Sequence, residues 1–153
     1  IGFLSERPGQ KFESVPLMED EILAILPMDH PLAHCGAFPL KAFGDEQFIV
    51  SRHEYDADSY HVLESYRAAY GKIPRVKFTS SDSCSIISMV ENGLGVSVLP
   101  QLMLFTPAPV VAARRIDPSF SRKLIMGVKS LKEISPAAAR FMNCAGRFLK
   151  GVE

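Results

Sequence analysis

The stretch SSDSCSIISMVENGLGVSVLP, residues 80–100, constrains the fold more than any other segment of this chain. Serines and an aspartate crowd its start, and apolar residues such as Ile86 and Val90 then recur at helical spacing. Gly93 follows this stripe, where left-handed C-caps are common, and a short apolar run ends at Pro100. The pattern predicts a helix, a glycine turn and a buried strand in direct succession.

The two glycines of this stretch do not fit a phosphate-binding loop. In a dinucleotide fingerprint the glycine turn follows a strand and opens a helix, so that phosphates meet the helix N-terminus. Here Gly93 follows a helix, Gly95 enters a strand, and Val98 stands where a third glycine would be needed. We therefore expect Gly93 to cap the helix and Gly95 to allow a neighbouring element to approach closely.

Strand and helix patterns alternate along the rest of the chain. Strands are predicted at residues 1–4, 21–27, 47–51, 75–80 and 122–130, and further helices at residues 58–70 and 136–149. The positions predicted to be buried are Val62, Leu63, Tyr66, Ala69 and Tyr70, then Val76 and Phe78, and in the last helix Phe141, Met142, Ala145, Phe148 and Leu149. Short connections and strands that are apolar on both faces predict an α/β fold whose sheet is covered by helices.

Composition argues against several classes of protein. Seventeen basic residues balance seventeen acidic ones, whereas a duplex-binding domain usually carries a basic excess. The sequence shows no bilayer-spanning apolar run and no signal segment. Cys35, Cys84 and Cys144 are too far apart for a CxxC metal pair, and free cysteines favour a reducing, cytoplasmic compartment. We predict no metal, no cofactor and no catalytic group.

Two segments resemble LysR-type transcriptional regulators: SMVENGLGVSVLP at residues 88–100 and PMDHPLA at residues 27–33. The order of segments also matches that family over essentially the whole chain. IGFL comes first, then an apolar strand, HPLA, FIV and the serine-rich helix, and a late apolar strand and a terminal amphipathic helix complete it. The resemblance implies an effector-binding domain with a periplasmic-binding-protein-like (type II) α/β fold. In that fold two crossing strands join two lobes, and a small molecule binds in the cleft between them.

The resemblance also implies a division of the chain. Residues 1–27 would be a remnant of the first lobe with the first crossing strand, residues 28–120 the second lobe, and residues 121–153 the return crossing strand and the C-terminal helix. The crossing strands would be residues 21–26 and 123–128. The family's winged helix-turn-helix and the opening half of its first lobe have no counterpart, so we expect an N-terminally truncated fragment that contacts DNA only through the missing domain. An incomplete first lobe would leave Phe141, Phe148 and Leu149 partly uncovered, favouring self-association into a homo-oligomer.

The resemblance places the ligand at the carboxyl ends of strands, where helix N-termini converge. Ser80 and Ser81 match the second-lobe turn that faces the ligand, with Ser81 as a hydroxyl donor and backbone N–H groups near Asp82 and Ser83 beside it. Such a site favours a small anionic metabolite. Simple N-capping of a solvated helix is the alternative explanation of the same residues.

Further candidates lie after two other strands. Ser5 follows the first strand, and Ser51 and Arg52 end the QFIV strand, where an arginine could pair with a carboxylate or merely face solvent. Two other functions stay open: a periplasmic-type solute-binding protein, and an α/β enzyme using His53 as general acid or base. The free cysteines and GLGVSVLP favour the regulator.

Overall fold

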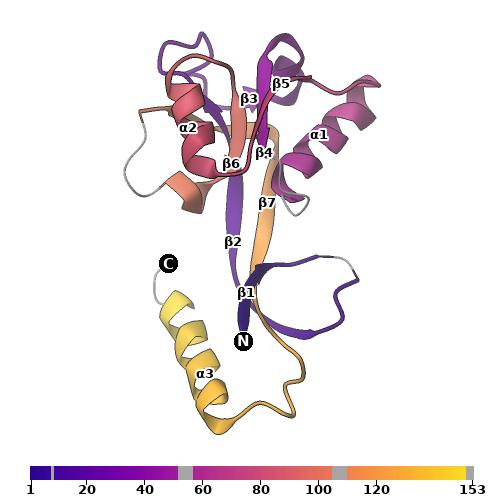
Figure 1. Cartoon of the computed structure of the whole chain (residues 1–153), viewed down its shortest axis with the longest axis vertical. Helices are drawn as coiled ribbons and strands as arrows, with labels where there is room; N and C mark the ends of the chain where they lie inside the picture. The colour runs from indigo at the N-terminus through magenta and orange to yellow at the C-terminus, as the bar shows by residue number, and fades with distance from the viewer. Residues whose placement is uncertain (8, 52–56, 105–109, 151–153) are drawn as a thin grey trace. The chain divides into compact units, whose positions relative to one another are not determined.

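The computed structural model describes residues 1–7, 9–51, 57–104 and 110–150 (Figure 1). The strands are β1 (Gly2–Ser5), β2 (Glu13–Leu26), β3 (Phe38–Pro39), β4 (Gln47–Ser51), β5 (Arg75–Ser80), β6 (Ser97–Pro100) and β7 (Ala112–Val128). The α-helices are α1 (Ala57–Tyr70), α2 (Ser83–Glu91) and α3 (Pro136–Lys150), and the short 3-10 helices are η1 (Leu40–Asp45) and η2 (Gln101–Leu104). The predicted order of strands and helices is confirmed. None of the described helices is long and apolar enough to cross a bilayer.

The chain divides into two compact units. Unit 1 consists of Ile1–Asp20 and Arg122–Glu153, and unit 2 consists of Glu21–Ser121. Strands β2 and β7 each contribute residues to both units. The strands predicted at residues 21–26 and 123–128 are only parts of β2 and β7, because the remaining halves mix exposed and buried positions and lack a continuous apolar run. The assignment of the two units as effector-binding lobes stays a prediction.

Unit 2 is built on β2, β6 and the parallel pair β4–β5. β6 pairs antiparallel with β2, with Ile22 opposite Pro100 and Ile25 opposite Ser97. β4 joins this layer through Val96, whose N–H donates to the Gln47 carbonyl at 2.9 Å and whose carbonyl accepts from the Ile49 N–H at 2.8 Å. The strands of unit 2 are therefore linked by backbone hydrogen bonds across residues 47–49 and 96.

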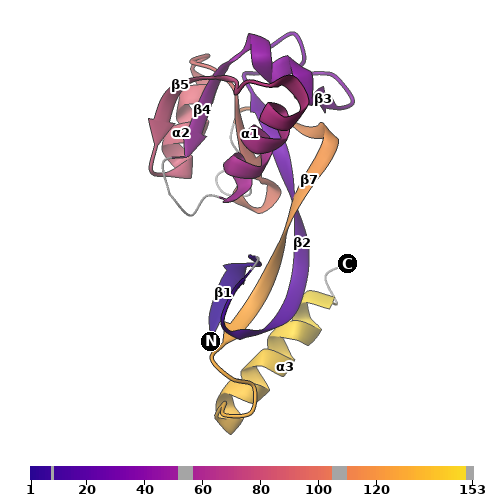
Figure 2. The ribbon, with the colours of Figure 1, turned by 90° about the vertical axis from the view of Figure 1, so that its right-hand side faces the viewer.

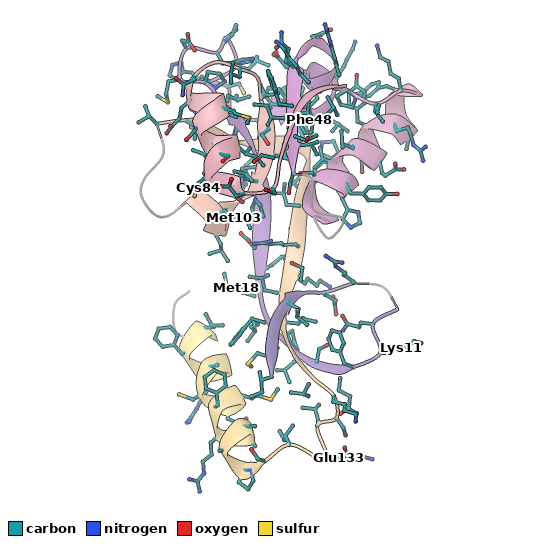
Figure 3. All side chains as sticks on the ribbon, in the orientation of Figure 1. Lys11, Met18, Phe48, Cys84, Met103 and Glu133 are labelled. Atoms are coloured by element: carbon teal, nitrogen blue, oxygen red, sulfur yellow. The ribbon has the colours of Figure 1, made fainter. Side chains whose placement is uncertain are left out.

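Two apolar cores lie on opposite faces of these strands. Ile22, Ala24 and Leu26 of β2 belong to one core with Val62 and Tyr66 of α1. Leu23 and Ile25 belong to the other core with Ile86 and Val90 of α2. Successive side chains of β2 therefore point alternately into the two cores. The run of apolar residues on both faces of this strand predicted this arrangement. Figure 1 shows α1 and α2 on opposite sides of β4 and β6, and Phe48, labelled in Figure 3, is fully buried between them.

Two predictions of burial in this unit are wrong. Ala69 and Tyr70 at the end of α1 are exposed, whereas Val62 and Tyr66 in its earlier turns are buried in the core. Val76 of β5 is also exposed, at 37%. Val76 and Phe78 were predicted to point inward together, but only Phe78 packs in the core that contains α2. The register with β4 shifts between Phe48 and Ile49, so Val76 lies opposite Phe48 and Phe78 lies opposite Ile49.

Both glycine predictions are confirmed. Gly93 has φ 70° and closes α2, with its N–H donating to the Val90 carbonyl at 2.9 Å and the Leu94 N–H donating to the Met89 carbonyl at 3.0 Å. Gly95 has φ 154°, and a Cβ at this position would lie 2.1 Å from the Gln47 carbonyl oxygen. Gly95 is therefore required for the contact between the β6 segment and β4.

Unit 1 contains β1, parts of β2 and β7, and α3. β1 pairs antiparallel with β7, with Gly2 opposite Gly127 and Ser5 opposite Leu124. The core is small: Met142 of α3 packs with Met126 and Val128 of β7. Among the positions predicted to be buried, Phe141 and Phe148 are instead exposed at 49% and 71%. Ile1, Phe3 and Leu4, in the predicted strand at residues 1–4, are exposed, because β1 ends the sheet order β1-β7-β2-β6.

A buried ion pair fixes β2 beside β7 within unit 1. The Arg122 guanidinium donates to Asp20 Oδ2 from Nη2 at 2.8 Å and from Nε at 2.9 Å. The Asp20 side chain is 1% exposed and that of Arg122 is 16% exposed. Because both charged groups are largely out of water, each contributes to the solvation of the other.

Candidate functional site

Five of the predicted site residues come together in unit 2. Ser51 ends β4 and is the register partner of Ser80, which ends the parallel strand β5. Ser81 and Asp82 follow at once, and α2 begins at Ser83. Figure 2 shows β4 and β5 side by side next to α2. The carboxyl ends of two parallel strands and a helix N-terminus therefore meet, as predicted.

Asp82 is the N-cap of α2, and its carboxylate binds the helix terminus directly. Oδ1 accepts from the Ser85 N–H at 2.9 Å, and Oδ2 accepts from the Ser85 hydroxyl. Ser80 Oγ accepts from the Asp82 N–H and donates to the Asp82 carbonyl, both at 3.3 Å. The simple capping explanation is thus correct for Asp82 and Ser80. It does not account for Ser81, which is exposed in the same turn.

The hydrogen bonds from the hydroxyl and the backbone N–H of Ser85 hold the pKa of the Asp82 carboxyl below its ordinary value of 3.8. Desolvation opposes this lowering of the pKa, and the backbone N–H of Cys84 and the Ser80 hydroxyl add to it. Asp82 is therefore an anion at neutral pH, and it partly neutralises the positive end of the α2 dipole. A ligand at this turn meets hydroxyl groups and a carboxylate rather than a bare helix terminus.

The stability that the Asp82 cap contributes should depend on pH. Because the pKa of Asp82 is lower in the folded chain, its ionised form stabilises that state above pH 3.8, and the stabilisation is lost as pH falls through the folded-state pKa. Asp82→Ala should lower the melting temperature at neutral pH, and the difference from wild type should shrink in acid. Circular dichroism melts over a pH series measure this. Asp82→Asn keeps a capping oxygen without a titrating group, so its deficit should be smaller than that of Asp82→Ala and should also shrink in acid. Deficits of both variants that stay constant with pH would contradict the explanation.

Ser83 contacts a neighbouring segment of unit 2. Its hydroxyl lies 3.3 Å from the Met103 sulfur of η2, so α2 and η2 are in contact at the candidate turn. Cys84, in the first turn of α2, is exposed and free. Figure 3 labels both Cys84 and Met103. Met103 was not among the predicted site residues. The sequence QLML at residues 101–104 contains no signal that would have placed Met103 beside the start of α2.

The other predicted residues are not part of this group. Ser5 ends β1 in unit 1, where it is opposite Leu124, and the next residue's N–H donates to the Lys123 carbonyl at 2.8 Å. Arg52 and His53 lie outside the described residues. The roles of Ser5 and Arg52 as ligand-binding residues therefore stay predictions.

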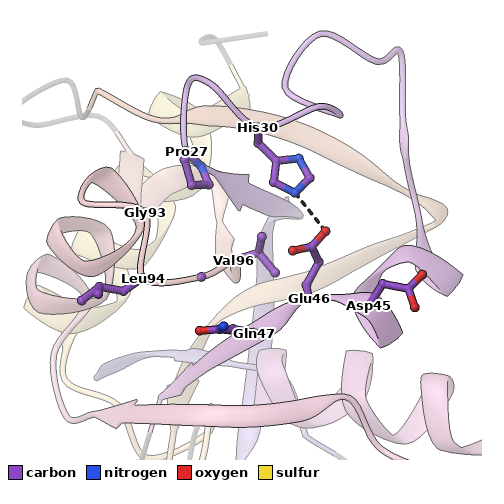
Figure 4. A pocket seen from close by; sticks show the side chains of 9 residues that line it. Pro27, His30, Asp45, Glu46, Gln47, Gly93, Leu94 and Val96 are labelled. Atoms are coloured by element: carbon purple, nitrogen blue, oxygen red, sulfur yellow. Dashed lines mark hydrogen bonds and ion pairs between the residues drawn. The ribbon is translucent and has the colours of Figure 1, made fainter.

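A hollow of about 230 Å³ lies at the opposite end of β4, where Gln47 begins the strand (Figure 4). Its lining includes His30, Asp45 and Glu46, together with the Gly93–Gly95 turn. His30 Nε2 lies 3.0 Å from Glu46 Oε1, and His30 Nδ1 accepts from the Leu32 N–H at 3.0 Å. These contacts assign the ring proton to Nε2. They also give His30 a structural role, because its ring bonds to the backbone of the 27–35 turn and to Glu46. The described residues contain no group of His, Cys, Asp and Glu suited to a metal ion.

Comparison with known proteins identifies the family. The profile of the LysR substrate binding domain matches residues 1–150. The chain belongs to this family. Its fold is accordingly the periplasmic-binding-protein-like type II fold, as the resemblance implied.

Known relatives of this LysR domain are transcriptional regulators. The uncharacterized HTH-type transcriptional regulator YvbU of Bacillus subtilis is 34% identical over 140 residues, covering 90% of this chain and 47% of YvbU. The chain thus spans about half the length of the curated relatives it matches. These relatives favour the regulator prediction over the solute-binding alternative.

Solved structures of low sequence identity share the fold. The regulatory domain of CcmR from Synechocystis PCC6803, in complex with 2-PG, has a TM-score of 0.84 and 22% identity, covering 97% of this chain and 72% of that chain. The effector-binding domain of QuiR, in complex with shikimate, has a TM-score of 0.80 and 20% identity, covering 97% of this chain and 71% of that chain.

Proposed function

We propose that this chain is the effector-sensing part of a LysR-type transcriptional regulator. In unit 2 the effector contacts the surface formed by Ser51 and residues 80–83, with Ser81 as the principal hydroxyl donor. Ser5 and Arg52 are further candidate contacts. The observation that supports this site most directly is the register pairing of Ser51 with Ser80 beside the N-terminus of α2.

The effector is a small hydroxylated acid. Exposed serine hydroxyls and the first N–H groups of a helix suit an anionic oxygen. The Asp82 carboxylate on the same turn accepts hydrogen bonds, so it favours ligand hydroxyl groups and disfavours a second bare anion. The solved complexes of CcmR with 2-PG and of QuiR with shikimate support a small-molecule ligand, and shikimate is a hydroxylated carboxylate.

The full regulator acts without catalysis. Effector binding shifts the population of two arrangements of a homo-oligomer, and a winged helix-turn-helix outside the matched region contacts DNA in the cytoplasm. The balanced charge of this chain supports the separation of DNA contact from effector sensing, because duplex binding needs a basic surface.

Thermal unfolding against a panel of small carboxylates, hydroxy acids, amino acids and aromatic acids tests the proposal. A ligand at a hundred times its dissociation constant stabilises the folded chain by about 2.7 kcal/mol. In a domain of this size that corresponds to a rise in melting temperature of about 5 °C. A selective rise for one class supports the proposal. A flat panel with both this chain and a full-length regulator would contradict it.

Ser81→Ala should then weaken binding of the selected acid by about five- to tenfold, since one hydroxyl hydrogen bond is worth about 1 kcal/mol. Calorimetric titration measures the affinity. Ser119→Ala, at an exposed serine of β7, is the matched control and should bind normally. Equal affinity in the Ser81 variant would remove Ser81 from the site.

A further inference from the structure

The hollow at the start of β4 has no part in the proposed effector site. Its lining residues lie between Pro27 and Val96, inside the continuous segment Glu21–Ser121 that forms unit 2. The hollow adjoins Gln47, which begins β4, whereas the candidate effector site includes Ser51, which ends that strand. The walls of the hollow therefore come from unit 2 alone.

The size of the hollow limits what it can hold. Its volume is about 230 Å³, whereas pockets for drug-sized ligands have volumes of about 300–1,000 Å³. Figure 4 shows it bordered by the 27–35 turn, the start of β4 and the turn that follows α2. The occupant is therefore a small molecule of several non-hydrogen atoms rather than a nucleotide or a peptide segment.

Glu46 lines the hollow with only one of its carboxylate oxygens engaged. Oε1 lies 3.0 Å from His30 Nε2, and the Leu32 N–H donates to the other ring nitrogen of His30 at 3.0 Å. Both ring nitrogens are thus in use, and the His30 side chain is 10% exposed, so the ring fixes where the carboxylate lies. Among the described residues nothing bonds to Glu46 Oε2, although the Glu46 side chain is only 27% exposed. A partly buried carboxylate oxygen is therefore free to accept a hydrogen bond.

The electrostatics of the hollow favour a positive charge. Asp45 adds a second carboxylate to the lining, and Gly93 follows the C-terminus of α2, where the helix dipole is negative. Lys77 donates its ammonium protons to the Gln47 side-chain oxygen rather than to either carboxylate. Apart from His30, no described basic residue pairs with Asp45 or Glu46. A cationic ligand would therefore meet negative charge that the protein leaves uncompensated.

Apolar side chains beside these carboxylates indicate an organic cation rather than a metal ion. Leu94 and Val96 also line the hollow, and Leu94 is 41% exposed, so its side chain can lose contact with water when a ligand covers it. The described residues contain no group of three or more His, Cys, Asp and Glu side chains suited to a metal ion. The lining therefore fits an ammonium group that carries a short alkyl chain.

We propose that this hollow is a second ligand site, which binds a small alkylammonium ion. The ammonium group donates to Glu46 Oε2, while His30 holds the same carboxylate through Oε1. Asp45 adds negative charge beside the contact, and the alkyl chain lies along Leu94. The site shares no residue with the proposed effector site, so the chain binds an amine independently of the acid.

A nuclear magnetic resonance titration of the isotope-labelled chain with butylammonium chloride tests the proposal. Amide signals of residues 45–47 and 93–96 should shift together and saturate, with a dissociation constant of about 1 mM or below. Sodium butyrate has a similar chain and the opposite charge, so it should cause no saturating shift there. Methylammonium lacks most of the alkyl chain and should bind at least about fivefold more weakly.

Glu46→Gln should weaken butylammonium binding at least about tenfold, because it removes the charged acceptor. The variant keeps an oxygen that can accept from His30, so it should melt near the wild-type temperature. Glu64→Gln is the matched control, because Glu64 lies on α1, pairs with Arg67 at 2.7 Å and is outside the lining of the hollow. That variant should bind butylammonium normally. Leu94→Ser should reduce the difference in affinity between butylammonium and methylammonium.

Several results would overturn the proposal. Signals that shift without saturating, or butyrate that binds equally well, would show that the hollow does not select a cation. Equal affinity in Glu46→Gln would show that Glu46 is not the anchor, and an equal loss in Glu64→Gln would show a response to net charge alone. Displacement of butylammonium by calcium chloride at about one tenth of its concentration would make the hollow a metal site. Ser81→Ala should leave amine binding unchanged, so failure of this site and failure of the proposed effector site can be told apart.

Discussion

Gly95→Ala is expected to destabilise the folded chain by about 3–5 kcal/mol, which combines an unfavourable backbone conformation with overpacking. The backbone at Gly95 has φ 154°, which side chains rarely adopt, and the added Cβ would lie 2.1 Å from the Gln47 carbonyl oxygen. That oxygen accepts the Val96 N–H, and the contact joins the β6 segment to β4. The clash can therefore be relieved only if the Val96–Gln47 hydrogen bond breaks. Both cores of unit 2 depend on this link between the β6 segment and β4.

Urea denaturation followed by circular dichroism measures the loss as a shift in midpoint. Gly36→Ala is the matched control, because no atom lies within 4 Å of its added Cβ and its φ is not positive. That variant should unfold near the wild-type midpoint or slightly above it. If Gly95→Ala and Gly36→Ala unfold at the same urea concentration, the close approach does not contribute to stability.

Arg122→Met is expected to destabilise the chain by about 3–5 kcal/mol, because it takes the guanidinium from a carboxylate that stays buried. Asp20, 1% exposed, would lose its hydrogen bonds from Nη2 and Nε. Arg115→Met provides a matched control. Arg115 contacts Glu21 at 3.0 Å but is 72% exposed, so its loss should change stability by less than about 1 kcal/mol.

The double variant Asp20→Leu/Arg122→Met distinguishes a lost pair from a lost side chain. Replacement of both charges by apolar groups removes the buried carboxylate that Arg122→Met deprives of its guanidinium, so this variant should regain most of the stability that Arg122→Met loses. Urea midpoints of the single and double variants give the coupling. A double variant less stable than Arg122→Met would show that packing by the Arg122 stem, rather than charge pairing, holds β2 beside β7.

Local patterns predicted most of the elements of this fold but not what covers them. The runs at residues 22–26 and 48–50 are apolar on successive positions, and the structure buries or half-buries both faces of them. Phe141 and Phe148 fit a helical stripe equally well and yet are exposed. Periodicity states which residues share a face, whereas burial depends on the neighbour that the face meets. Distant segments supply that neighbour, and a single sequence does not reveal it.

The candidate site shows the same limit. Ser80 to Ser83 could be predicted because a helix N-terminus is encoded locally, and Ser51 because it ends an apolar strand. Their meeting depends on the parallel register of β4 and β5, which is long-range. N-capping was the alternative explanation of these residues, and the hydrogen bond from the Ser85 N–H to the Asp82 carboxylate confirms it, because a short carboxylate at a helix start accepts from the first turn.

The division of the chain has a consequence for the order in which it folds during synthesis. Unit 2 is one continuous segment, Glu21–Ser121, while unit 1 needs both Ile1–Asp20 and Arg122–Glu153. A ribosome therefore releases everything required for unit 2 before Asp20 can meet Arg122 or β1 can pair with β7. Once unit 2 has folded, it shortens the loop that separates the two halves of unit 1 and lowers the entropy lost in joining them. The nascent chain should protect α1 and α2 from proteolysis earlier than β1 and α3.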